Sequence, residues 1–208
     1  MAGVSVVPPG VAGGGAPLAA DSLAGQFAAD QLTAGQGTLP RVLAQSAAAA
    51  TGTNQTLRLT YFTAARSFVS TQVAVYSGGT AAAATPTLVR LGLYSVAANG
   101  DLTLVASTAN DTALFAAAQT AYTKAWSASV QLVAGQRYAR GDLVVTAATA
   151  PTYPGLSVHG GSATATAVAG AAPRLTGAVT GQADLPASVA AASVAATTNG
   201  MIYSVILP

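Results

Sequence analysis

From residue 56 onward the chain alternates between apolar and polar side chains with a period of two, in short runs separated by turn-forming residues. Leu57, Leu59 and Tyr61 form one such run, and residues 89–94 form another. Because successive side chains of a β-strand point to opposite faces of the sheet, this alternation is typical of strands. Many short strands joined by Gly, Pro and Asn turns predict an all-β fold, an antiparallel β-sandwich of the jelly-roll type.

Two glycine-containing dipeptides mark turns between these strands. Asn99-Gly100 separates two alternating runs, and both of its positions are expected to adopt positive φ in a hairpin. Gly135 follows an apolar run and precedes a strand that carries Tyr138, so it is expected to supply the positive φ of a second turn. Further strands are expected at residues 71–75, 102–104, 122–133, 137–146, 156–159, 174–179, 188–195 and 201–207.

The N-terminal quarter of the chain has a different character. Proline and glycine cluster at residues 8–17, which favours an extended arm because proline removes backbone donors and glycine costs ordering entropy. A short helix is predicted after Asp21 or Ser22, since either side chain can cap it. We therefore predict an extended N-terminal anchoring arm at residues 1–52 and a β-sandwich domain at residues 53–208. The arm shows no basic segment ahead of an apolar one, so no secretory signal is expected.

Charge is scarce throughout the chain. Only 7% of its residues are charged, whereas a soluble domain normally carries about a quarter. The acidic residues are all aspartates, one residue is a lysine and one a histidine, and 51% of the chain is hydrophobic, mostly as alanine. This composition argues against an independently diffusing enzyme. It favours a protein whose surface is covered by copies of itself or by other subunits.

The same composition excludes several classes of partner. The arginines are spread singly, without a run of basic residues interleaved with aromatics, so no nucleic-acid partner is expected. A long uncharged stretch, residues 185–208, contains Ser, Thr, Asn and Pro and ends in an alternating pattern, which suits a strand and not a membrane-inserted helix. Without cysteine and with one histidine, the chain is expected to hold no disulfide, metal or cofactor.

Several short patterns have an ordinary explanation that outweighs a functional one. Residues 140–142 read Arg-Gly-Asp, an integrin-type tripeptide, but so short a match arises by chance. His159 with Asp142 or Asp184 could assist a serine nucleophile, yet no nucleophile-elbow motif is present and we expect no catalytic residues. Asparagine and aspartate at residues 99–101 and 110–111 are explained by turn chemistry better than by calcium binding.

One face of a predicted strand stands out because it concentrates aromatic side chains. Tyr122, Lys124 and Trp126 lie two residues apart and therefore share a face. If that face is exposed, it is a candidate platform for stacking on a glycan. If it is internal, Trp126 is a core or subunit-contact residue, and the bulk of tryptophan in a chain of small side chains favours this alternative.

Parts of the sequence resemble a module of minor tail and fibre-like proteins from tailed bacteriophages that infect actinobacteria. The resemblance rests on LRLTYFTA (57–64), TPTLVRLGLYSVAANGDLTLVASTANDTALF (85–115) and AYTKAWSASVQLVAGQRYARGDLVVTAATAPT (121–152). It extends more weakly to APRLTGAVTGQADLPASV (172–189), and it does not include the first 37 residues. After Tyr138 the family pattern continues as an apolar strand, whereas Ala-Arg-Gly-Asp here predicts a break or bulge.

The resemblance implies a structural virion protein, a minor tail or fibre-type subunit with no enzymatic activity. It implies a sandwich that is mounted on the particle by residues 1–50, contacts other virion proteins there, and projects for attachment to a host-surface glycan. We expect a symmetric homo-oligomer, with a trimer favoured, because faces rich in alanine and threonine suit close contacts between chains. The alternatives are a capsid decoration or head-fibre protein and, in a different class, a carbohydrate-binding module; a cell-wall hydrolase is a further one.

Overall fold

The computed structural model describes residues 35–44, 46–82, 86–156, 171–197 and 200–208. Within these residues the fold is all-β: every named strand pairing is antiparallel, and the two helical elements are single 3₁₀ turns, η1 (Arg41–Leu43) and η2 (Ala191–Ser193). The prediction of an antiparallel, sandwich-like fold is thus confirmed. The helix expected after Asp21 or Ser22 lies outside the described residues.

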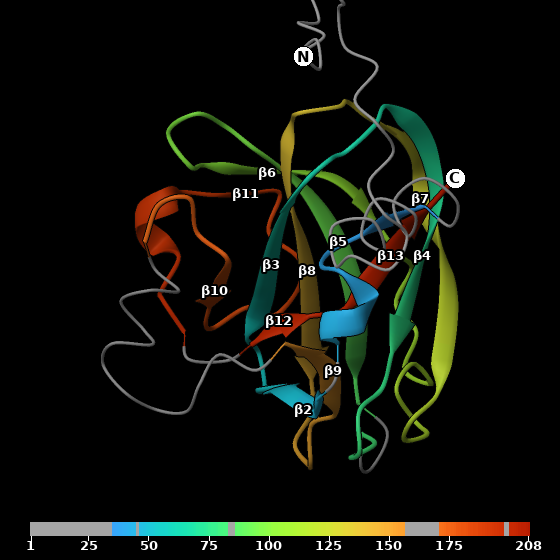
Figure 1. The fold of residues 1–208 in the computed structure, drawn as a ribbon. Coiled ribbons are helices and arrows are strands. Elements are labelled where there is room, and N and C mark those ends of the chain that lie inside the picture. The colour runs from blue at the N-terminus through green and yellow to red at the C-terminus, as the bar shows by residue number, and fades with distance from the viewer. Residues whose placement is uncertain (1–34, 45, 83–85, 157–170, 198–199) are drawn as a thin grey trace, which may run out of the picture.

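The strands form three sheets that enclose one core (Figure 1). The largest sheet has the order β10 (Thr176–Val179), β3 (Leu57–Thr63), β8 (Arg137–Val145), β5 (Leu88–Val96), β6 (Leu102–Ser107) and β11 (Ser188–Val189). The second has the order β1 (Gln36–Gly37), β13 (Ser204–Leu207), β4 (Phe68–Tyr76) and β7 (Ala121–Leu132). The third and smallest has the order β12 (Met201–Ile202), β9 (Thr152–Leu156) and β2 (Ser46–Thr51).

The connections between the sheets have the arrangement expected of a jelly-roll-like sandwich. β3 and β4 follow one another in sequence but lie in different sheets, and so do β7 and β8. β3 pairs with β8 while β4 pairs with β7, so the two crossing connections run side by side in opposite directions. This wrapped pairing closes the sandwich around its core.

The six-stranded sheet is buried on both faces. Toward the other sheets its apolar side chains, such as Leu91 and Leu93, join the central core. On its outer face Leu57, Leu59 and Tyr61 pack with the segment that contains Leu185, Val189 and Val194 in a second cluster. A third cluster, around Leu39, Tyr203 and Val205, lies on the outer side of the four-stranded sheet. Leu39, Leu43 and Ala44, in and beside η1, pack into this cluster.

The predicted turns form, with one change of type. Gly135 has φ +78° in the turn between β7 and β8, as expected. The β5–β6 hairpin also forms, but of its two predicted positive-φ positions only Gly100 has one, at φ +89°. The Ala97 carbonyl accepts from Gly100 N at 2.9 Å, and Ala97 N donates to the Asp101 carbonyl at 2.9 Å. The loop is therefore one residue longer than a two-residue turn, and only its glycine needs the left-handed conformation.

The break or bulge expected at residues 139–142 does not form. β8 keeps an unbroken register with both β3 and β5 through this stretch. The irregularities of the described strands lie instead in β7, opposite Ser70 and Gln72, in β6, opposite Leu93 and Tyr94, and in the pairing of β2 with β9. A strand held between two neighbours has partners for all its backbone groups, whereas bulges are tolerated toward sheet edges.

The structure also differs from two of the predicted strands and from the division of the chain predicted near residue 52. β1 pairs with β13 and β2 pairs with β9, so residues 36–51 are built into the sheets and the boundary near residue 52 does not separate them from the sandwich. The strand expected at residues 156–159 lies earlier, at β9, and residues 157–159 are outside the described part. The strand expected at residues 188–195 is the two-residue β11 followed by η2.

Candidate functional site

The face that Tyr122, Lys124 and Trp126 share is directed inward. Trp126 is 6% exposed and belongs to the central core, where its indole Nε1 donates a 2.9 Å hydrogen bond to the Ser70 hydroxyl. The Tyr122 ring packs edge-on against Phe115, with centroids 5.8 Å apart. This strand therefore offers no exposed aromatic platform, and its tryptophan lies in the core of its own chain.

The two polar groups of this face are engaged within the chain. The Tyr122 hydroxyl accepts from Ala117 N at 2.9 Å and donates to the Ala117 carbonyl at 3.2 Å. Lys124 forms an ion pair with Asp111, and the lysine hydrogen bond is the main reason why the pKa of that carboxyl lies below its ordinary value. These contacts fasten the loop before β7 onto the strand. The Tyr122 hydroxyl and the Lys124 ammonium group, which a glycan would have contacted, are thus already bonded within the chain.

The Arg140-Gly141-Asp142 tripeptide lies in the interior. Arg140 is 0% and Asp142 2% exposed, and the two form an ion pair between the sheets. Arg58 is the register partner of Asp142 on β3 and adds a second positive charge close by. Burial raises the pKa of Asp142, while Arg140 and Arg58 oppose that shift. A tripeptide hidden in this way cannot bind a receptor, and it acts as a buried polar cluster of the core.

The carboxylates of the other described aspartates, Asp101 and Asp184, are bonded to neighbouring groups of the protein. Asp101 accepts from Ala191 N at 2.8 Å and from Asn99 Nδ2 at 2.7 Å, and these two bonds hold its pKa below the usual value. Asp184 pairs with Arg90. In the part of the chain that the structure describes, no three His, Cys, Asp or Glu side chains gather in a group that could hold a metal ion. His159 falls outside that part.

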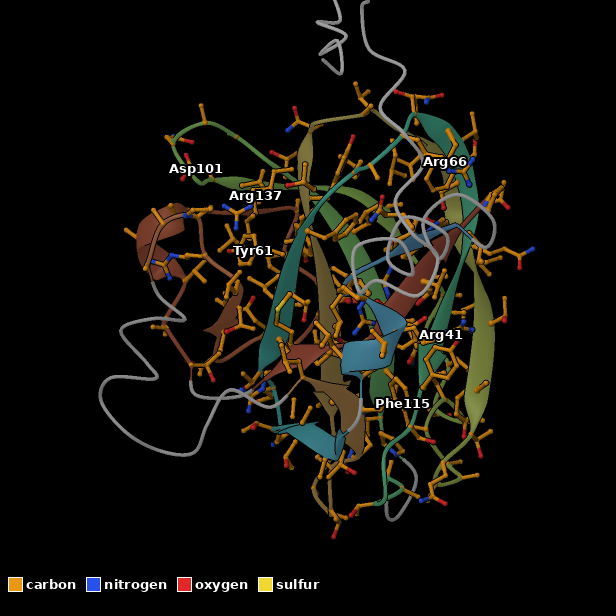
Figure 2. All side chains as sticks on the ribbon, viewed as in Figure 1. Arg41, Tyr61, Arg66, Asp101, Phe115 and Arg137 are labelled. Atoms are coloured by element: carbon orange, nitrogen blue, oxygen red, sulfur yellow. The ribbon has the colours of Figure 1, made fainter. Side chains whose placement is uncertain are left out.

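A pocket of about 740 Å³ opens on the outer side of the six-stranded sheet. Its walls come from five places: Tyr61 of β3, the end of β5 and the β5–β6 turn at residues 96–100, residues 135–137 at the start of β8, residues 172–174 ahead of β10, and Ala191 of η2. The β10–β3 pairing brings residues 172–174 close to the others, since Tyr61 N donates to the Leu175 carbonyl at 3.0 Å. Figure 2 shows Arg137 and Tyr61 together on this side of the molecule, with Asp101 nearby.

Two arginines meet in this pocket. The guanidinium of Arg137 lies over the Tyr61 ring, 5.0 Å from its centroid, and donates to the Arg174 carbonyl. Arg174 Nη1 donates to the Val194 carbonyl at 2.6 Å. Burial raises the pKa of Tyr61, and the nearby charges of Arg174 and Arg137 oppose that shift. The pocket thus holds two fixed positive charges around a tyrosine.

Neither arginine drew notice in the sequence. They are separated by most of β8 and everything up to β10, and nothing in the local pattern around either one indicates a site. The signal that could have found them is a pairing of the strand expected at residues 174–179 with the strand that contains Leu57, Leu59 and Tyr61, and the sequence did not predict that pairing. Pairing order is set by tertiary packing, which periodicity does not report.

A second hollow of about 550 Å³ lies over the opposite sheet. Arg41, Tyr76 and Tyr203 line it, and the two tyrosine rings stack at 5.3 Å. Its aromatic floor belongs to the third apolar cluster, which fastens residues 39–44 onto the four-stranded sheet. The hollow is therefore a groove between packed elements. The pocket that holds Arg137 and Arg174, called the arginine pocket below, is the better candidate for a ligand site.

Comparisons with known proteins identify no relative of this chain. No protein-family model matches it, and no curated protein is significantly similar to it. A search for membrane-crossing helices, restricted to the described ranges, finds none of sufficient length and hydropathy.

Proposed function

We propose that this chain is a structural protein of a tailed-bacteriophage particle, a minor tail or fibre-type subunit without catalytic activity. The part of the chain ahead of β1 holds it on the particle through contacts with other virion proteins, and the β-sandwich, which includes β1 and β2, projects toward the host surface. The resemblance over residues 57–64, 85–115 and 121–152 motivates the choice of virion.

The observation that supports an assembled protein is the small number of charges left at the surface. The described residues hold eight cationic side chains and four aspartates. Three of these twelve, Arg58, Arg140 and Asp142, are buried in the interior. Four more neutralise each other in the pairs Arg90–Asp184 and Lys124–Asp111. A surface so poor in charge gives little protection against association, which suits a domain that neighbouring subunits cover.

The edge strand β7 is where such a neighbour fits best. It closes one side of the four-stranded sheet and is 12 residues long. Its exposed positions carry Ala, Thr, Ser and Gln, and Lys124 is its single charged residue. Long edge strands with few charges pair readily with other chains. We propose that this edge contacts another copy of the chain, three copies around one axis being the favoured arrangement.

A capsid decoration or head-fibre protein would have the same surface, so its position on the particle separates it from a tail subunit. The carbohydrate-binding alternative, as the sequence suggested it, needed Trp126 on an exposed face. Because Trp126 is buried, that version has no platform on β7.

Immunogold labelling of purified particles tests the assignment. An antibody raised against residues 53–208 is expected to label the tail end of intact particles, with pre-immune serum as the control. Labelling of the head alone would replace the tail assignment with the decoration alternative. Absence of the protein from gradient-purified particles, checked by immunoblot, would overturn the virion proposal itself.

A further inference from the structure

We propose that the pocket formed by Tyr61, the β5–β6 turn, Arg137 and Arg174 binds an acidic saccharide. In this arrangement the two guanidinium groups hold the carboxylate or phosphate of the sugar. The inference goes beyond the structural role proposed above, because it depends on the pocket and not on where the chain is mounted.

The donors of this pocket are only partly used. Arg137 and Arg174 each donate to one backbone carbonyl, of Arg174 and Val194 respectively. In the described part of the chain no other acceptor contacts these two guanidinium groups. These bonds fix the positions of both groups, and each guanidinium keeps further N–H donors on a residue that lines the cavity. An arginine held in this way is ready to bind a carboxylate or phosphate through two parallel hydrogen bonds.

The positive charge of the pocket is not neutralised by the protein. Ion pairs among the described residues engage Arg90, Lys124 and Arg140, and neither pocket arginine takes part in one. Asp101 is the acidic side chain of the adjoining turn, but its oxygens accept from Ala191 N and Asn99 Nδ2. Two cations beside a partly buried cavity favour an anionic ligand, since the low surrounding dielectric strengthens the attraction.

The size and walls of the pocket indicate that the anion belongs to a larger, hydroxyl-rich molecule. A volume of about 740 Å³ falls in the range of small-molecule sites and exceeds what a bare phosphate fills. Away from the arginines, the walls are turns of Ala, Gly and Pro with the amide side chains of Asn99 and Gln136. Asn99 bonds to Asp101, and Gln136 Nε2 donates to the Val96 and Arg137 carbonyls, so these walls offer backbone hydrogen-bond groups beside small apolar side chains.

A nucleotide fits these walls less well than a sugar. Stacking of a base needs a free aromatic face. The aromatic residue of the pocket is Tyr61, which is 4% exposed and already lies beneath the guanidinium of Arg137. Because no aromatic face is free for stacking, the pocket favours a saccharide over a nucleotide base.

Amide chemical-shift titration of the wild-type protein is the first test. Glucuronate and glucose 6-phosphate serve as carboxylate and phosphate probes, with neutral glucose and inorganic phosphate as matched controls. We expect shifts at Gly100, Gly135 and Gln136, and an affinity about tenfold or more above that for glucose, because charge-assisted bonds distinguish the probes. The affinity should fall as salt is added. The stronger of the two acidic probes identifies which oxyanion the site prefers.

Charge-removing variants are the second test. Arg137→Gln and Arg174→Gln should each weaken binding of the preferred probe about tenfold, the value of one charge-assisted contact. Arg66→Gln removes the same charge from a residue that lies away from the pocket in Figure 2 and should leave the affinity within about twofold. Circular dichroism shows which variants remain folded, and the equally uncharged Arg137→Met and Arg174→Met replace any that do not.

Three results would overturn the proposal. Equal affinities for glucose and the acidic sugars would show that the arginines do not determine binding. Chemical-shift changes confined to residues elsewhere would show that the probes bind outside the pocket. If inorganic phosphate binds as tightly as glucose 6-phosphate and glucuronate does not bind, the pocket recognises a phosphate and not an acidic saccharide. None of these results alters where the protein lies on a particle, so a failure here is distinguishable from a failure of the virion proposal.

Discussion

Gly141 shows how one residue of the buried tripeptide serves packing. Gly141 and Gly92 are register partners on β8 and β5, and the Tyr94 ring lies against both. A methyl group at Gly141 would come within 2.7 Å of Leu57 Cδ1 and 3.1 Å of Tyr94 Cε2. Two neighbouring glycines thus form the trough that this aromatic ring fills, which is a known way of stabilising glycine in a sheet.

Gly141→Ala is expected to lower the free energy of unfolding by about 1–3 kcal/mol, because Leu57 and Tyr94 are fully buried and cannot move aside freely. Urea denaturation measures the change. Gly79→Ala is the matched control, since an added methyl group there meets no atom within 4 Å, and it should change stability by less than about 0.5 kcal/mol. Equal effects of both substitutions would contradict the trough.

The Arg140–Asp142 pair is a second feature of individual residues that predicts the effect of substitutions. Both side chains are buried, and Arg140 Nε, Arg140 Nη1 and Asp142 Oδ1 have no hydrogen-bond partner. Asp142→Asn should cost about 3–5 kcal/mol, because it leaves a buried guanidinium without its counter-charge. The double variant Arg140→Met with Asp142→Leu should recover most of that loss, since apolar groups of similar size require no desolvation. Guanidinium denaturation of both proteins makes the comparison, and a double variant less stable than the single one would refute it.

At the scale of elements, the loop ahead of β7 is fastened by Asp111. Its carboxylate accepts from Ala113 N at 3.0 Å and pairs with Lys124 on the strand. The Lys124 contact and these backbone bonds lower the pKa of Asp111 below its model-compound value of 3.8. A carboxyl whose pKa is depressed by folding contributes stability above pH 3.8 and loses it as the pH falls through the lower, folded-state pKa.

Asp111→Asn should therefore be less stable than wild type at neutral pH by about 0.5 kcal/mol, the size expected for a part-exposed pair. The difference should shrink to nothing as the pH is lowered beneath 3.8. Thermal melts of both proteins between neutral and strongly acidic pH measure it, with Asp184→Asn at the other surface pair for comparison. A difference that stays constant through the acidic range would exclude this role for Asp111.

Alternation in the sequence predicted the long strands well. β3, β5 and β8 lie where the period-two runs are, because such runs reflect local chain geometry. It did not predict that polar members such as Arg58 and Arg140 face the interior. An arginine in an alternating run is expected at the solvent face. Here residues 172–197 cover the side that carries Leu57, Leu59 and Tyr61, and the opposite side, with Arg58 and Arg140, faces the other sheets, so neither side is left to solvent. The arginine pocket escaped prediction for the same reason.

At the scale of the molecule, the β7 edge makes a prediction about assembly. Static light scattering of the recombinant 20.1 kDa chain should give the mass of a small oligomer, with a trimer favoured. Thr123→Lys places a charge on the exposed edge and should shift the mass toward the monomer, because lysine blocks edge pairing. Thr180→Lys is the matched control at an exposed threonine outside β7 and should leave the mass unchanged. A soluble wild-type monomer at high concentration would contradict the assembly.

The pairing of β1 with β13 sets how a mechanical load enters the domain. The two residues of β1 pair with Val205 and Ile206 of β13, and Thr38 N adds a bond to the Ser204 carbonyl at 2.9 Å. Because so few bonds hold it, β1 is expected to detach under tension before the longer strands β3 to β8. Its release would expose the apolar side chains of Leu39, Tyr203 and Val205.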